Sequence, residues 1–280
     1  MDRILVPLDF SSNSLHALRY AQQLAAALGN VPVHLMYVWH PTLYPVDAPG
    51  SLPVTYTENT GRVQLLAFAD EYGIPESETT LEVGFPAERI VEASKLDDID
   101  LIVLGSAERE PGLADRLVGT IATEVCEDAH CPVLVVPEGK DFGQGFEHIL
   151  YASSSSATDE STVTRVMDLA RRFRADVHFV HVQTDDDEED VAEAVAVENT
   201  LFEDLHSDTK LGLRAQLVTI EDDSVVEGLT QYADENDIDL MVSVTRRRSW
   251  WQGLFERSQT KQLTLYAELP LLVLHLDDHD

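Results

Sequence analysis

The sequence predicts an α/β protein made of two tandem, doubly wound parallel sheets of five strands each. Short apolar runs alternate with amphipathic helical patterns, the same order of elements occurs twice, and 280 residues correspond to about two domains of roughly 150 residues. Strand–helix alternation with helical crossovers is typical of parallel sheets. A hydrophobic content of 44% is sufficient for two ordinary globular cores.

The elements of the first half follow one another in a regular order. Ile4–Leu8 and Val33–Val38 are nearly continuous apolar runs, as in strands that are covered on both faces. Between them we expect a helix with Ser11 or Ser12 as its cap and Gly29 as its stop. The rest of the half predicts, in order, a helix over about 58–72, strand Thr79–Gly84, helix Pro86–Lys95, strand Asp100–Leu104, helix Gly119–Asp128 and strand Val133–Val136.

The second half repeats this order. ILVPLDFSSNS begins at Ile4 and ILYASSSSATD at Ile149, and the strand VHLMYV is matched by VHFVHV. DDIDLIVLG at Asp97 matches NDIDLMVSV at Asn236, and CPVLVVP matches LPLLVLH. The Gly-rich, charged stretch between the halves is typical of a linker. We therefore expect domains over 1–139 and 146–280, joined by residues 140–145.

The chain is strongly acidic. Nineteen Lys and Arg against 51 Asp and Glu give a net charge of −32. Nucleic acids and anionic membranes would repel such a chain, so neither is expected as a partner. No apolar run approaches the roughly 18 residues of a membrane span. The segment MDRILVPLDF lacks the pattern of a signal peptide, so a soluble, cytoplasmic protein is expected.

Two groups of metal-ligand residues have simpler interpretations. Cys126 and Cys131 bracket His130, but this set lacks a fourth ligand and the usual spacing, so we expect buried or turn cysteines. His178 and His181 lie on one strand with side chains on opposite faces, so they would not share a metal ion. No metal site is therefore predicted.

Two polar runs are also interpreted structurally. Ser153–Ser156 is not surrounded by the G-x-S-x-G elbow of a serine nucleophile, and a helix-initiating turn is expected instead. The acidic run over 185–190 lacks the spacing and glycine of an EF-hand. We expect a solvated loop that enters a helix over about 191–204.

A series of short motifs resembles one known family. The first half carries ILVPLDFS, then G-F-P at Gly84–Pro86, D-L-I-V-L-G at Asp100–Gly105, and V-G-T at Val118–Thr120 before CPVLVVP. In this order, and repeated, the motifs resemble the universal stress protein family in its tandem two-domain form, over nearly the whole chain. The resemblance implies a Rossmann-like, adenine nucleotide alpha hydrolase-like fold and a non-catalytic stress-response role.

The resemblance also implies a nucleotide site in the first domain, with ATP or AMP as the ligand. Nucleotide-binding members use a loop of pattern G-x2-G-x9-G-[ST] that opens a helix, and an Asp that holds the ribose hydroxyls. The matching residues here are Asp9, Gly105, Gly119 and Thr120, with Pro7, Val38 and Leu104 where the family lines the adenine pocket. All lie near the carboxyl ends of strands, where open α/β sheets bind ligands.

The loop departs from the family pattern. The stretch from Gly105 to Gly119 is one residue longer, and Glu108 replaces the second glycine, so a carboxylate would face the phosphates. Nucleotide binding and a loop that has lost tight binding are therefore both open. Asp9 has an alternative role as a cap of the first helix or turn.

The second domain lacks the site. The replacements are Ser154 for Asp9, Val244 for Gly105, Arg257 for Gly119 and Ser258 for Thr120. Bulky Trp250, Trp251 and Phe255 would prevent the close backbone approach that a phosphate needs. These aromatic residues either fill the vacant cleft, anchor an interface, or pack in the core. Arg246–Arg248 either bind an anion or pair with acidic neighbours.

Three functions are open. The first is a cytoplasmic stress-response module that senses adenine nucleotide. The second is an enzyme that hydrolyses ATP slowly, although no general base or Walker-type lysine is evident. The third is an interaction scaffold that binds no nucleotide. We expect strands Pro132–Val136 and Pro270–Leu274 to pair edge to edge, and two chains to form a homodimer of four domains.

We predict that the protein tolerates or requires salt. Of its 19 basic residues only four are lysines, and the acidic surface repels itself in dilute buffer. In 1 M salt the Debye length falls to about 3 Å, and that repulsion is screened. The melting temperature, measured by circular dichroism, should rise from low to molar KCl. A melting temperature that falls over this range would contradict the prediction.

Overall fold

The computed structural model describes residues 1–40, 58–106, 120–143, 145–153, 160–184, 214–245 and 269–276. The chain separates into two compact units, and the division between them falls inside strand β5 (Val133–Val136), between Val133 and Leu134. Because β5 lies beside β4, it is described with the first unit. The domain boundaries expected from the sequence stay a prediction. The helix expected over about 191–204 and the acidic run before it lie outside the described residues.

The elements of the first unit are close to those predicted. Helix α1 has Ser11 as its N-cap, and Gly29, with φ of 97°, follows its C-cap residue Leu28. Most boundaries differ from the expectation by one residue, although α3 ends two residues before Lys95. The elements are β1 (Ile4–Leu8), α1 (Ser12–Ala27), β2 (Val33–Trp39), α2 (Glu58–Glu71), the 3₁₀ turn η1 (Glu76–Glu78), β3 (Thr79–Val83), α3 (Pro86–Ala93), β4 (Leu101–Gly105), α4 (Thr120–Asp128) and β5 (Val133–Val136).

The strands of the first unit follow the order β3-β2-β1-β4-β5. Parallel pairing joins β1 to both β2 and β4, with Leu5 opposite His34 on one side and Ile102 on the other. Ile102 N donates to Pro132 O at 3.0 Å, which places β5 beside β4. The doubly wound parallel sheet predicted from the sequence is confirmed.

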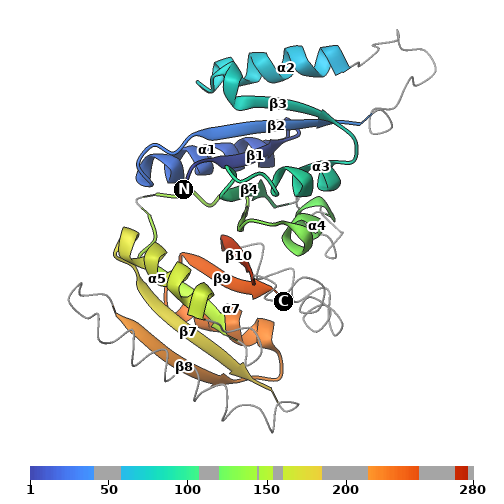
Figure 1. The fold of residues 1–280 in the computed structure, drawn as a ribbon. Helices are drawn as coiled ribbons and strands as arrows, with labels where there is room; N and C mark the ends of the chain where they lie inside the picture. The colour runs from blue at the N-terminus through green and yellow to red at the C-terminus, as the bar shows by residue number, and fades with distance from the viewer. Residues whose placement is uncertain are drawn as a thin grey trace. The chain divides into compact units, whose positions relative to one another are not determined.

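Helices cover both faces of this sheet (Figure 1). Helices α1 and α2 lie on the face of Leu35 and Tyr37, where Phe10 contacts Tyr37 with ring centroids 4.8 Å apart. Helices α3 and α4 pack together on the opposite face, toward which His34 and Met36 point. Burial on both faces explains why these strands are continuous apolar runs.

The second unit has the same architecture. All of its strand pairs are parallel, and its order β8-β7-β6-β9-β10 repeats that of the first unit. Two tandem copies of one fold are therefore confirmed. The elements are β6 (His148–Ser153), α5 (Glu160–Phe173), β7 (Asp176–Gln183), β8 (Ala215–Glu221), α7 (Val225–Glu235), β9 (Leu240–Thr245) and β10 (Leu271–His275).

Both units use one aspartate to tie the start of the first strand to its neighbour. In the first unit, Asp100 N donates to Arg3 O at 3.1 Å, and the Asp100 carboxylate accepts a hydrogen bond from Asp2 N. In the second unit, Asp239 N donates to His148 O at 2.9 Å. These bonds match the two copies residue for residue.

The described helices include none with the length and apolar content that crossing a bilayer requires.

Replacing Asp239 by Ala should destabilise the second unit. Its Oδ2 accepts hydrogen bonds from Glu147 N at 2.7 Å and His148 N at 2.9 Å. Hydrogen bonds to a charged group contribute about 1.5–3 kcal/mol, so Asp239→Ala should lower the free energy of unfolding by that order in urea titrations. Asp234→Ala removes the same charge from an exposed position of α7 and serves as the control. Equal losses in both variants would contradict this prediction.

Candidate functional site

The carboxyl ends of β1, β2 and β4 come together at one edge of the first sheet. Leu8, the last residue of β1, pairs with Tyr37 near the end of β2. Leu5 pairs with Ile102, and this register brings Leu8 level with Gly105, the last residue of β4. The segments that follow these strands therefore begin at neighbouring points. Open α/β sheets bind ligands at such an edge.

Asp9 follows β1 and stabilises the turn into α1. Its Oδ1 accepts hydrogen bonds from Ser11 N at 3.0 Å and from Ser11 Oγ at 2.6 Å. Ser11 Oγ in turn accepts from Ser14 N at 3.2 Å and caps the helix. Asp9 thus has the turn-stabilising role that its place before two serines suggests. Within the described ranges Asp9 Oδ2 accepts no hydrogen bond, so one carboxylate oxygen can still receive a donor.

Gly105 lies where β4 passes the first turn of α1. A Cβ at this position would lie 2.5 Å from Asn13 O, so the close approach of the two backbones requires glycine. Asn13 is 7% exposed, and its Oδ1 has no hydrogen-bond partner in the part of the chain that is described. A buried acceptor without a donor costs free energy unless a ligand or water satisfies it. The motifs in the sequence do not identify Asn13.

Pro7, Val38 and Leu104 share one face of the sheet. Pro7 pairs with Met36, two residues before Val38, and the register of β1 with β4 sets Leu104 level with Pro7. Val38 and Leu104 are buried, and Pro7 is half-buried. These apolar side chains are suited to packing against a planar ring, next to the Asp9 carboxylate.

The loop that would complete the site lies largely outside the described residues. Gly119 and Glu108 lie outside the described residues. The positions of the Glu108 carboxylate and of the residue by which this loop exceeds the family pattern are therefore not described. Thr120 is described as the first residue of α4. The structure therefore brings five of the seven expected site residues to one edge and leaves the other two as predictions.

The equivalent edge of the second unit is only partly described. Val244, which replaces Gly105, is 2% exposed within β9. The other residues singled out by the sequence in this unit lie outside the described ranges: Ser154–Ser156, Arg246–Arg248, Trp250, Trp251, Phe255, Arg257 and Ser258.

The two cysteines are buried and form no disulfide. Burial raises the pKa of Cys126 and of Cys131 to about 12, so both thiols are protonated at neutral pH. Core cysteines, as expected, are confirmed. Across the described ranges, no cluster of three His, Cys, Asp or Glu side chains is arranged to hold a metal ion.

His178 belongs to a polar cluster on the face of the second sheet. Its Nδ1 lies 2.9 Å from Tyr232 Oη and 3.0 Å from Gln216 Nε2. Burial lowers the pKa of His178, with a further contribution from His148, and burial raises the pKa of Tyr232. The motifs do not predict this cluster, although the matched histidines of VHLMYV and VHFVHV are a signal of it.

The strand order and the ligand edge define a tandem α/β protein of the doubly wound class. The model of the universal stress protein family matches residues 1–137 and again residues 145–275. The chain therefore belongs to the universal stress protein family, in its tandem form. The resemblance inferred from the motifs is confirmed.

Relatives of known name agree with this assignment. The universal stress protein MJ0531 of Methanocaldococcus jannaschii is 33% identical over 144 residues, which cover 49% of this chain and 83% of that protein. The universal stress protein E homolog of Haemophilus influenzae is 31% identical over 153 residues, which cover 50% of this chain and 49% of that protein. The matched region thus spans about half the length of the Haemophilus protein.

Solved structures show the same fold over nearly the whole chain. A universal stress protein from Archaeoglobus fulgidus DSM 4304 matches with a TM-score of 0.69 at 16% identity, covering 98% of both chains. The functionally unknown protein PA1789 of Pseudomonas aeruginosa PAO1 matches with a TM-score of 0.61 at 18% identity, covering 99% of this chain and 94% of that one.

Replacing Gly105 by Ala should destabilise the first unit. The added methyl group would overlap Asn13 O, and overpacking of this kind costs roughly 1–3 kcal/mol. We expect a loss of that order in the free energy of unfolding, measured by chemical denaturation in molar KCl. An unchanged free energy would show that β4 and α1 are packed less closely than described.

Proposed function

We propose that this chain is a cytoplasmic, non-catalytic stress-response protein whose first domain binds an adenine nucleotide, ATP or AMP. We further propose that it assembles as a homodimer of four domains. The observation that carries the nucleotide proposal is the edge formed by β1, β2 and β4. There an apolar surface adjoins Asp9 Oδ2 and the buried Asn13 Oδ1, two acceptor atoms that receive no hydrogen bond from the described residues.

In the proposed complex each group at this edge has a distinct role. Pro7, Val38 and Leu104 pack against the adenine ring, because they form the apolar part of the surface. Asp9 Oδ2 accepts a hydrogen bond from a ribose hydroxyl. Asn13 Oδ1 accepts a second donor from the ligand, either a hydroxyl or the adenine amino group.

The phosphates would lie at the N-terminus of α4. Backbone N–H groups and the helix dipole at such a terminus favour an anion. Gly119 and Thr120 are the residues that would approach the phosphates. The extra residue and Glu108 in the preceding loop would weaken triphosphate binding more than monophosphate binding, because like charges repel. AMP is therefore the ligand we expect to bind with the smaller electrostatic penalty.

Hydrolysis of ATP is the less favoured alternative. Phosphoryl transfer needs a group that positions the attacking water and a cation at the phosphates. Among the described residues, no lysine follows β1, β2 or β4 at this edge, and Asp9 is already engaged through Oδ1. The features of this edge support binding rather than turnover.

Isothermal titration of AMP and ATP into the protein in molar KCl tests the proposal. We expect saturable binding that Asp9→Ala weakens at least tenfold, because a hydrogen bond to a charged group contributes about 1.5–3 kcal/mol. Asp222→Ala is a matched control, because Asp222 Oδ1 also accepts from the backbone N–H of a helix-capping serine, Ser224, but lies in the second unit.

The outcomes separate the three functions. Binding that Asp222→Ala retains and Asp9→Ala loses supports the proposed site. Release of ADP from ATP over time would make the protein an enzyme instead. If neither AMP nor ATP gives a binding signal in the titration, the remaining function is that of an interaction scaffold that binds no nucleotide. Light scattering on the same samples should give the mass of two chains.

A further inference from the structure

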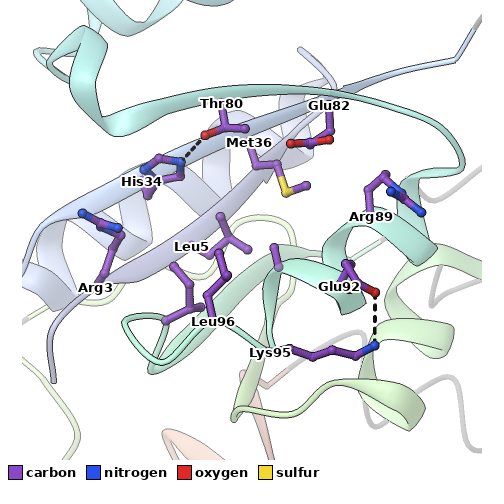
Figure 2. Close-up of a pocket in the computed structure, with 12 residues that line it drawn as sticks. Arg3, Leu5, His34, Met36, Thr80, Glu82, Arg89, Glu92, Lys95 and Leu96 are labelled. Carbon is purple, nitrogen blue, oxygen red and sulfur yellow. Dashed lines mark hydrogen bonds and ion pairs between the residues drawn. The ribbon is translucent and has the colours of Figure 1, made fainter.

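A second pocket lies on the other side of the first sheet from α1. Its volume is about 420 Å³, which is within the usual range of small-molecule sites. Leu5 of β1 and Met36 of β2 form its floor, and Leu96, shortly after α3, faces them (Figure 2). All of its lining residues belong to the described part of the first unit. None of them is among the expected nucleotide-site residues.

One end of the pocket is an ordered polar group. His34 Nε2 lies 2.8 Å from Thr80 Oγ1 (Figure 2). His34 Nδ1 lies 3.2 Å from Glu78 Oε2. Arg3 Nε lies 3.1 Å from the same Glu78 oxygen. The strand residues His34 and Thr80, together with Glu78 of η1 and Arg3 just before β1, therefore form a network of donors and acceptors at this end.

The other end carries charges that are less fully paired. Lys95 and Glu92 form an ion pair at 3.1 Å. Arg89 and Glu82 line the pocket, and neither side chain makes an ion pair or hydrogen bond with the described residues (Figure 2). Arg89 Nε is buried and has no acceptor among the described residues. Three cations and two carboxylates line the pocket, so it does not share the strong negative charge of the chain: Arg3, Arg89, Lys95, Glu82 and Glu92.

The second unit carries a larger side chain at the equivalent helix position. Asp100 and Asp239 occupy equivalent positions in the two units. Each donates its backbone N–H to the carbonyl of the residue just before the matched apolar runs that begin at Ile4 and Ile149. Counting back seven residues from each makes Ala93 equivalent to Tyr232. The buried helix residues agree with this alignment: Ala87 and Ile90 in α3 match Val226 and Leu229 in α7.

Tyr232 fills the space that Ala93 leaves open. Its Oη lies 2.9 Å from His178 Nδ1 and 3.2 Å from Gln216 Nε2. His178 is the counterpart of His34 in the repeated strand, and Gln216 pairs with His178 as Glu78 lies beside His34. In the second unit, therefore, a tyrosine from the helix places its phenol hydroxyl beside the strand histidine.

A second difference between the helices also favours the open pocket. Arg89 in α3 is equivalent to Gly228 in α7. A Cβ at Gly228 would lie 3.1 Å from Ile220 and 3.2 Å from Val182, so α7 lies close to its sheet there. Arg89 instead extends over Gly84, where a Cβ would lie 3.3 Å from the arginine side chain.

We propose that the pocket of the first unit binds a small phenolic acid, a single aromatic ring with a hydroxyl group and a carboxylate. The ring lies on Leu5 and Met36, in the space that Tyr232 fills in the second unit. The hydroxyl bonds to the polar group of His34, Thr80 and Glu78. The carboxylate pairs with Arg89, one helical turn before Ala93.

Titration of 4-hydroxyphenylacetate into the full chain in molar KCl, followed by calorimetry, tests this proposal. We expect saturable binding at one site per chain, and weaker binding of phenylacetate, which lacks the hydroxyl. Ala93→Tyr should lower the affinity at least about tenfold, because it supplies the ring covalently. Glu88→Tyr adds the same side chain at an exposed position of α3 and should leave the affinity unchanged. Asp9→Ala should also leave it unchanged, which separates this site from the proposed nucleotide site.

Two further variants keep the test decisive if Ala93→Tyr does not fold. Arg89→Gln should weaken 4-hydroxyphenylacetate at least about tenfold and p-cresol, which has no carboxylate, less than twofold. Tyr232→Ala should lower the melting temperature, and p-cresol should restore part of the loss. The absence of saturable binding to the wild-type chain, or equal affinity in wild type and Arg89→Gln, would overturn the proposal.

Discussion

The parallel register of β1 with β2 and β4 is the constraint on which both proposed sites depend. This pairing brings the three carboxyl ends to one edge and turns Pro7, Val38 and Leu104 to one face. The same register places Leu5 opposite His34, and both residues line the pocket for which we propose a phenolic ligand. A shift of one residue would move each set of side chains to the other face of the sheet. Main-chain hydrogen bonds, rather than any single side chain, therefore hold the functional groups in place.

The two units share one strand order but carry different side chains beside the sheet. The anchoring aspartates Asp100 and Asp239 occupy equivalent positions, and the strand order is the same. What differs is the side chain that faces each cavity, with Ala93 in one unit and Tyr232 in the other. The ligand edge differs in the same way, because Val244 stands where Gly105 admits the backbone of α1. The duplication thus keeps the hydrogen-bonded frame and changes the space beside it.

Sequence patterns predict the frame because its strands are buried on both faces and its first helix is capped by Ser11 and followed by Gly29. They also predict that Asp9 and Gly105 lie at the same edge of the sheet, since Asp9 follows one parallel strand and Gly105 ends the strand beside it. They do not predict that Asn13 Oδ1 is buried with no hydrogen-bond donor among the described residues, nor do they predict the cluster of His178 and Tyr232. Both depend on how closely a helix approaches the sheet, a distance that periodicity does not encode.

Hydrogen–deuterium exchange with and without AMP tests the central claim most directly, because it shows which unit responds. In molar KCl, AMP should slow amide exchange at the carboxyl ends of β1 and β4 and in the first turns of α1 and α4. The peptides covering β6, β7 and β9 should exchange at unchanged rates. Equal protection in both units, or protection confined to the second, would contradict the account that only the first copy offers a nucleotide site.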